Sequence, residues 1–195
     1  MTTLTVWRHP KPCDGVGRCI GHTDVSVDPR KIKRLAHRIR RTARQQGLPR
    51  VVWTSALERC FSVGRCLARW GWRHHVDARL SEMNFGAWDG LNWGDISKEA
   101  VDAWCADFAA HAPGNGESLS QVLARCREVV AEFSGQRETV CVVGHAGWIS
   151  ALSWLTTNGD ALPSAAQWTA SVPYNSAHAY DVNAGDLKTL KSQTR

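Results

Sequence analysis

Two short apolar runs in this sequence each end at a histidine. Residues 3–7 lead into Arg8 and His9, and residues 139–143 lead through a glycine into His145. Short apolar runs bounded by turn residues are typical of buried strands. Because ligands bind beyond the carboxyl ends of parallel strands in open α/β sheets, we expect these three side chains to meet over one anionic group.

Two further charged residues fit the same site. Arg59 falls in the first turn of a helix that follows a predicted strand at 50–54, and the free N–H groups of a helix start also attract anions. Glu82 lies in a Gly- and Trp-rich segment, residues 81–94, and is the best candidate for the acid that protonates a leaving oxygen. Asp89 in the same segment is the alternative acid. Each of these residues, taken singly, is also consistent with a solvated side chain or a turn cap.

Together these residue types predict chemistry on a phosphate group. Arginine presents planar, forked donors that match phosphate oxygens. A neutral imidazole can attack phosphorus, and a second histidine can donate to an oxygen whose charge grows in the transition state. Because the attacking histidine must be neutral, we expect activity to fall on acidification through the histidine titration.

Alternating strand and helix signals predict the scaffold that positions these residues. Asp28 before a proline marks a helix start and Gly47 its end, and Ser55 with Glu58 forms a capping-box pattern for the next helix. An α/β fold follows: a three-layer sandwich with a mostly parallel open sheet and helices on both faces, in one domain over residues 1–195. We expect strands at about 3–8, 50–54, 72–76 and 138–143, helices at about 28–46, 55–70, 97–110, 118–134 and from 147 onward, and a closing hairpin of strands 175–182 and 187–190 around residues 183–186.

The composition is that of an ordinary globular domain, with 195 residues, 43% hydrophobic and 22% charged. No signal peptide is evident, and the most apolar stretch, residues 140–155, is shorter than the ~20 residues that span a bilayer. We therefore expect a cytoplasmic protein with no membrane partner. Seven scattered cysteines without a CxxC pair argue against a disulfide framework and against a zinc site, so no metal is expected.

The net charge is +6, and nine of the 24 Lys and Arg residues lie between Arg30 and Arg50. An apolar stripe at helical spacing runs through the same segment, so the basic residues occupy the solvated face of a helix. This pattern predicts no nucleic-acid partner and favours attraction of a small acidic substrate. The stripe consists of Ile32, Leu35, Ala36, Ile39 and Ala43.

Four segments, in this order, resemble the signature segments of the histidine phosphatase superfamily. They are residues 6–10 (VWRHP), 54–59 (TSALER), 80–90 (LSEMNFGAWDG) and 143–147 (VGHAG). The resemblance implies a phosphoglycerate mutase-like fold and a phosphomonoester phosphatase that acts through a covalent phosphohistidine, with no metal and no cofactor. It also implies His9 as the nucleophile, a phosphate pocket of Arg8, Arg59 and His145, and Glu82 as the proton donor to the leaving group.

Within the superfamily the chain is most similar to the bacterial α-ribazole phosphatase branch, on the evidence of residues 17–25 and 113–118. Members of this branch remove the 5′-phosphate of a nucleotide-like precursor late in cobalamin synthesis, which implies α-ribazole 5′-phosphate as the substrate. Pro10 stands where most of the superfamily has glycine and supplies no backbone N–H, and similar variants occur in this branch. The further substrate contacts predicted beyond the phosphate pocket are Arg18, Gly21, His22 and Trp88, with Trp93 as an open alternative.

Other functions remain open at this stage. A broad-specificity or phosphoglycerate mutase-like activity would use the same pocket. A catalytically silent phosphate sensor would be favoured if one of the five pocket residues were missing, and none is. The partner expected is a small-molecule phosphate ester, and one site of this kind often serves many esters. The sequence is compatible with a monomer or a dimer.

Overall fold

The computed structural model describes residues 2–134, 139–168, 171–183 and 186–190. Within these residues, six strands form one sheet in the order β3-β2-β4-β1-β5-β6. The strands β1 to β4 run parallel, β5 is antiparallel to β1, and β6 is antiparallel to β5. The mostly parallel sheet predicted from the sequence is confirmed. The strands are β1 (Thr2–Arg8), β2 (Val51–Thr54), β3 (Arg73–Val76), β4 (Val140–Gly144), β5 (Ala177–Asn183) and β6 (Asp186–Leu190).

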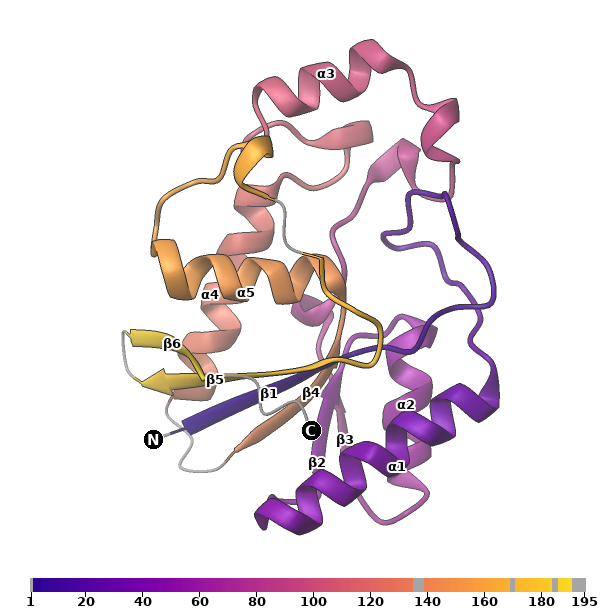
Figure 1. Cartoon of the computed structure of the whole chain (residues 1–195), viewed down its shortest axis with the longest axis vertical. Helices are drawn as coiled ribbons and strands as arrows, with labels where there is room; N and C mark the ends of the chain where they lie inside the picture. Colours follow the sequence, from indigo (N-terminus) through magenta and orange to yellow (C-terminus); the bar gives the residue numbers. More distant parts are fainter. Residues whose placement is uncertain (1, 135–138, 169–170, 184–185, 191–195) are drawn as a thin grey trace.

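Helices cover both faces of this sheet (Figure 1), as predicted for a three-layer α/β sandwich. On one face, α1 (Pro29–Gln46) and α2 (Glu58–Ala68) enclose a core that includes Trp7 and Val143. On the other face, α4 (Leu119–Ser134) and α5 (Ala146–Asn158) enclose a larger core against β1, β4 and β5. The apolar side of α4 is buried there, with only Val130 partly exposed.

The helix α1 forms as its sequence predicts. The Asp28 carboxylate accepts the Arg30 N–H at 2.7 Å, and Gly47 ends the helix at a φ of 65°, a left-handed conformation that favours glycine. Leu35 and Ile39 are buried, whereas the arginines of the opposite side are exposed. The basic residues of this segment are therefore the solvated side of an amphipathic helix.

The start of α2 differs from the prediction. The capping box of Ser55 and Glu58 does not form, and the helix begins at Glu58 with Leu57 in the cap position and no side-chain cap from either residue. The Glu58 N–H is instead accepted at 2.7 Å by the carboxylate of Asp24, from the loop before α1. A contact from a distant segment thus replaces the local cap and leaves the Ser55 hydroxyl available for another partner.

Residues 81–118, which we call the cap, lie beyond the carboxyl end of the parallel strands (Figure 1). The helix predicted at 97–110 is shorter, and α3 (Lys98–Ala106) has no buried residue. The chain leaves the helix at Asp107, which brings Phe108 inward to stack on Trp104 at 5.1 Å between ring centroids. The short 3₁₀ turns are η1 (Ala78–Leu80), η2 (Gly86–Trp88), η3 (Trp93–Asp95), η4 (Pro113–Asn115) and η5 (Ala165–Gln167).

The closing hairpin, two loop cysteines and the described helices complete the account of the fold. The closing hairpin is present as β5 and β6, and residues 184–185 at its turn lie outside the described residues. Among the free cysteines, Cys13 is exposed and Cys19 is buried, although both lie in one loop. None of the described helices has the length and apolar character needed to cross a membrane.

Candidate active site

The two strand ends that carry the histidines lie side by side. Arg8 ends β1 and is paired in register with Gly144, the last residue of β4. The His9 N–H donates to the carbonyl of Gly144 at 3.0 Å, and the ring centroids of His9 and His145 are 5.2 Å apart. Parallel pairing of β1 with β4 therefore brings His9 and His145 together, although they are 136 positions apart in the chain.

His9 is held as a neutral imidazole with a defined tautomer. Its Nδ1 lies 2.8 Å from the carbonyl oxygen of Pro10, which can only accept, so Nδ1 carries the proton and the lone pair is on Nε2. Burial, reinforced by the charges of Arg59 and Arg8, lowers the pKa of His9 to about 3. The sequence predicts a fall in activity through the ordinary histidine titration. With this lowered pKa of His9, we expect that fall at much lower pH. Pro10, which lacks an N–H, contributes through its carbonyl.

Arg59 is almost fully buried and is fixed by the loop that precedes α1. Its guanidinium donates to the carbonyls of Thr23, at 3.0 Å, and Gly21. The carboxylate of Asp89 accepts the N–H groups of Gly21, His22 and Thr23, which fixes the same loop from the other side. Burial raises the pKa of Asp89, but these hydrogen bonds outweigh it and leave the pKa below its usual value. Asp89 is thus a fixed anion that holds the Arg59 loop, which disfavours it as the alternative acid.

Arg8 is fixed by a segment that the sequence did not single out, residues 172–176. Its guanidinium carbon lies 3.7 Å above the ring centroid of Tyr174, a cation–π contact, and it donates to the carbonyl of Val172. The Tyr174 ring also lies edge-on to His9, with 5.6 Å between the centroids. No periodic pattern or motif marks Tyr174 in the sequence. Its role arises because β5 pairs with β1 and carries the preceding segment across the site.

The carboxylate of Glu82 is held between two backbone N–H groups. Oε1 accepts from Met83 at 3.0 Å, and Oε2 accepts from Gly147, in the first turn of α5, at 3.1 Å. A Cβ at position 147 would lie only 2.3 Å from Oε1 of Glu82. The glycine that follows His145 is therefore needed for the carboxylate to approach the helix start this closely.

His145 is fully buried beside His9. Its Nε2 lies 2.8 Å from the Oγ of Ser55 and 3.3 Å from the Sγ of Cys60. Burial, with the charge of Arg59, lowers the pKa of His145 well below its usual value, so the ring is neutral. Ser55 is a site residue that sequence reasoning missed, because its pattern with Glu58 indicated a helix cap.

A cavity of about 280 Å³ opens from these residues. Four of its lining residues, Arg8, His9, Arg59 and Glu82, form what we call the phosphate end. His145 is not among the lining residues. A second group of lining residues is apolar, and we call it the aromatic wall; it consists of Met83, Phe85, Trp93, Trp104, Phe108, Leu119, Val122 and Trp168. The remaining lining residues are Gly147, Tyr174 and, from the loop before α1, Pro12, Asp14, Gly15, Arg18 and Ile20.

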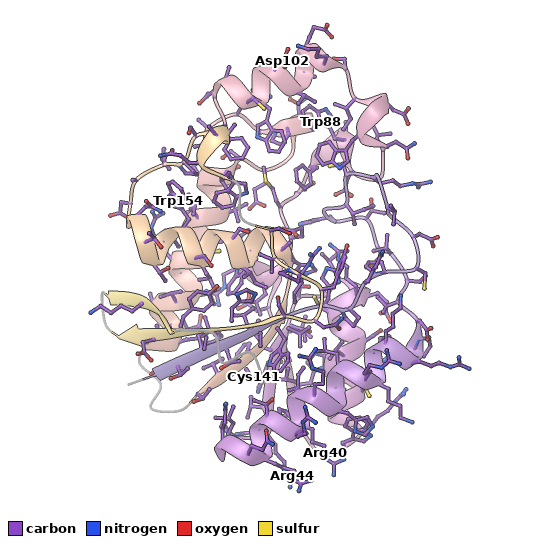
Figure 2. The ribbon with its side chains drawn as sticks, viewed as in Figure 1. Arg40, Arg44, Trp88, Asp102, Cys141 and Trp154 are labelled. Carbon is purple, nitrogen blue, oxygen red and sulfur yellow. The ribbon has the colours of Figure 1, made fainter. Side chains whose placement is uncertain are left out.

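Of the further substrate contacts predicted, the structure places Arg18 in the cavity lining, together with Trp93, the open alternative. Gly21 and His22 lie in the loop that holds Arg59, and Trp88 is buried against Cys19 and Ile96. Figure 2 shows Trp88 within the cap. Figure 2 also shows Arg40 and Arg44 of α1 at the opposite end of the molecule from Trp88. In the described part of the chain, no group of three or more His, Cys, Asp or Glu side chains could hold a metal ion.

Comparison with known proteins settles the family. A model of the histidine phosphatase superfamily (branch 1) matches residues 4–188. The chain belongs to this superfamily. Glucosyl-3-phosphoglycerate phosphatase of Mycobacterium tuberculosis is 33% identical to it over 157 residues, which cover 68% of this chain and 70% of that protein. As a histidine phosphatase, the protein acts on small phosphate esters.

Solved structures of histidine phosphatases share this fold. A mycobacterial glucosyl-3-phosphoglycerate phosphatase has a TM-score of 0.74 at 26% identity, over 96% of this chain and 95% of that chain. The α-ribazole phosphatase from Shigella flexneri has a TM-score of 0.79 at 24% identity, over 98% of this chain and 96% of that chain. The second likeness is one of fold alone. In fold, these two different phosphatases are comparably similar to this histidine phosphatase.

Proposed function

We propose that this histidine phosphatase hydrolyses the phosphomonoester of an alcohol with an apolar, aromatic body, through a phosphohistidine at His9. The observation that carries the proposal is the cavity, which joins the phosphate end directly to the aromatic wall. A phosphoryl group at one end and an aromatic leaving group at the other would fill it. α-Ribazole 5′-phosphate, whose base is a methylated bicyclic aromatic ring, is an ester of this kind.

In the first step, the lone pair on Nε2 of His9 attacks phosphorus and the bond to the leaving oxygen breaks. Arg8 and Arg59 neutralise the phosphoryl oxygens, and Glu82, protonated, gives its proton to the departing alcohol. The ring of the phosphorylated His9 is positive, because Nδ1 keeps its proton. The carbonyl of Pro10, 2.8 Å from Nδ1, stabilises that charge.

In the second step, the Glu82 carboxylate takes a proton from water as the water attacks phosphorus. The bond between phosphorus and Nε2 breaks, which releases inorganic phosphate and returns His9 to its neutral form. His145 has its Nε2 engaged by Ser55 and does not line the cavity, so we assign it to the support of the His9 ring rather than to direct contact with the phosphate. No step in this sequence of bond changes requires a metal or a cofactor.

The main alternative substrate is a phosphate ester that carries a carboxylate, as glucosyl-3-phosphoglycerate does. The identity of 33% to a phosphatase of that ester favours it. Beyond the phosphate end, however, Arg18 is the one cationic side chain among the described residues that line the cavity, and it is exposed at the rim. The aromatic wall gives a carboxylate no cationic partner, whereas it gives a flat aromatic base an extended apolar surface.

The test is phosphate release, with EDTA present, from α-ribazole 5′-phosphate, glucosyl-3-phosphoglycerate, 3-phosphoglycerate and p-nitrophenyl phosphate. His9→Ala provides the blank, and acid-labile labelling of His9 during turnover reports the phosphohistidine. Preferred turnover of α-ribazole 5′-phosphate supports the full proposal. Preference for either phosphoglycerate ester overturns the aromatic substrate, comparable rates on all four esters indicate broad specificity, and no release from any of them by the folded protein indicates a phosphate sensor.

A further inference from the structure

The turn at residues 113–118 has no part in the steps above, yet it carries a buried ion pair that reaches back to the candidate acid. Both carboxylate oxygens of Glu117 are bound by Arg125 of α4, Oε1 by Nε at 2.7 Å and Oε2 by Nη2 at 3.0 Å. The two side chains are only 18% and 14% exposed. A bidentate pair with little solvent around it is geometrically well defined, in contrast to a surface pair.

The remaining donor of Arg125 holds the chain just before Glu82. Its Nη1 donates to the carbonyl of Ser81 at 2.7 Å and to the carbonyl of Arg79 at 2.7 Å. The guanidinium thus joins the Glu117 carboxylate to the peptide group that precedes Glu82. A lysine could not bind the Glu117 carboxylate and the two carbonyls at the same time, because its ammonium group is compact and lacks the forked donors of a guanidinium.

Glu117 holds the chain just after Glu82. Its backbone N–H donates to the carbonyl of Asn84 at 2.7 Å, and its Oε2 accepts the Asn84 N–H at 3.3 Å. A third contact fixes Glu82 itself, whose carbonyl accepts from Nε2 of His22 at 2.9 Å. The backbone of residues 81–84 is therefore held before, at and after the acid.

The two segments meet backbone to backbone, with glycine at the closest points. A Cβ at Gly116 would lie 2.2 Å from the carbonyl oxygen of Asn84, and a Cβ at Gly86 would lie 2.1 Å from the carbonyl oxygen of Gly114. This approach leaves no side chain between the turn and the segment that carries Glu82. A shift of the Glu117–Arg125 pair would therefore move the backbone that carries Glu82.

We propose that the Glu117–Arg125 pair is a positioning device for Glu82, which sets the distance between its carboxylate and the leaving oxygen. This inference rests on the role of Glu82 as the acid in the proposed function. Proton donation by Glu82 matters most when the departing alcohol is a strong base. Loss of the pair should therefore slow esters of strongly basic alcohols and spare esters of weakly basic ones.

The experiment compares kcat/KM for phenyl phosphate and p-nitrophenyl phosphate, whose leaving groups differ in basicity while their shapes are similar. Arg125→Lys keeps the charge and loses the bridge, and Glu117→Gln, which keeps the shape, serves as a second variant if the first does not fold. Arg127→Lys is the matched control, because Arg127 lies on the same helix and pairs with the exposed Asp160. Glu82→Gln provides the reference pattern for loss of the acid, and His9→Ala the blank.

We expect Arg125→Lys to reduce kcat/KM by about tenfold for phenyl phosphate and by less than about twofold for p-nitrophenyl phosphate, since a misplaced acid loses part of the ~10²–10⁴-fold that proton transfer contributes. Glu82→Gln should show the same selectivity with a larger loss. Equal losses on both esters for the Arg125 and Glu117 variants, or none, would overturn the positioning role while Glu82→Gln remains selective. If Glu82→Gln is itself unselective, the acid assignment of the proposed function fails, and the positioning role fails with it.

Discussion

The phosphate end and the aromatic wall line one cavity but are built in different ways. The phosphate end takes Arg8 and His9 from the end of β1, Arg59 from the first turn of α2 and Glu82 from the cap. The wall is assembled from residues of the cap, from the start of α4 and from Trp168, through contacts between large side chains. Parallel pairing of β1 with β4 decides where Arg8 and His9 lie, whereas only side-chain packing selects the residues of the wall.

The two regions also differ in the contacts that hold their side chains in place. Around the phosphate end, every charged group is tied to backbone atoms, as in the bonds of Arg59 to two carbonyls and of Glu82 to two N–H groups. The wall holds its shape through ring contacts such as Trp104 with Phe85 at 6.1 Å between centroids. We therefore expect the phosphate end to tolerate almost no change, and the wall to adjust to substitutions with moderate losses.

The largest effect should come from removing the nucleophile. His9→Ala is expected to lower phosphate release by at least about 10⁴-fold on every ester, because the covalent intermediate forms on Nε2 of His9. Rates of phosphate release with excess substrate measure this. The control is His37→Ala, an exposed histidine of α1, which should retain the full rate. Substantial turnover by the His9 variant would remove the phosphohistidine mechanism.

A single methyl group beside Glu82 should have the next largest effect. Gly147→Ala places a Cβ 2.3 Å from Oε1 of Glu82 and must displace the carboxylate. A displacement of about 1 Å costs on the order of 10²-fold, so we expect that loss in kcat/KM for phenyl phosphate without a loss of thermal stability. Gly94→Ala is the matched control, since its Cβ would meet nothing within 4 Å. Equal kcat/KM values for the two variants would show that catalysis does not depend on the position of the Glu82 carboxylate against α5.

Acidification should destabilise the folded protein through the buried His9 and His145. Burial lowers the pKa of His9 to about 3 and that of His145 well below its usual value, whereas in the unfolded chain each takes up a proton below about pH 6.5. The unfolded state then binds more protons than the folded state. The free energy of unfolding is therefore at its full value above about pH 6.5 and falls as the pH drops below it, by about 1.4 kcal/mol per pH unit for each histidine.

Urea unfolding followed from about pH 7 to about pH 5 measures this slope. His145→Gln removes one titrating group and should flatten the slope by about one proton, whereas His37→Gln, which changes an exposed histidine, should leave it unchanged. A free energy of unfolding that is constant across this range would contradict the neutral, buried state of both histidines.

The smallest effect is expected on the wall. Trp93 lines the cavity and is 41% exposed, so Trp93→Ala removes contact area for an aromatic leaving group without opening the core. We expect kcat/KM to fall about three- to tenfold for α-ribazole 5′-phosphate, since a ring contact contributes about 0.5–1.5 kcal/mol, and to stay unchanged for a small alkyl phosphate. Trp70→Ala, remote from the cavity, is the control. Equal losses on the aromatic and the alkyl ester would show that the wall does not contact the leaving group.

Prediction from the sequence was most reliable where one element decides the outcome. The stripe of α1, its Asp28 and Gly47 caps and the buried face of α4 follow from the spacing of apolar residues and from local backbone chemistry, and the structure contains all of them. The prediction was wrong at Ser55, where a local capping pattern was outweighed by Asp24 from another segment. Trp88 and Trp93 show the same limit, because both lie in one segment without periodicity and only one of them lines the cavity.

By itself, the sequence determined the α/β order of elements and the placement of Arg8, His9 and His145 at strand ends, because hydrophobic periodicity and turn residues act within one element. Only the tertiary structure decided that Tyr174 covers Arg8, that Ser55 binds His145 and that Arg125 holds the backbone beside Glu82. Each of these contacts joins residues on different elements. Which of them meet depends on how the sheet, the helices and the cap pack together, and no local pattern in the chain encodes that.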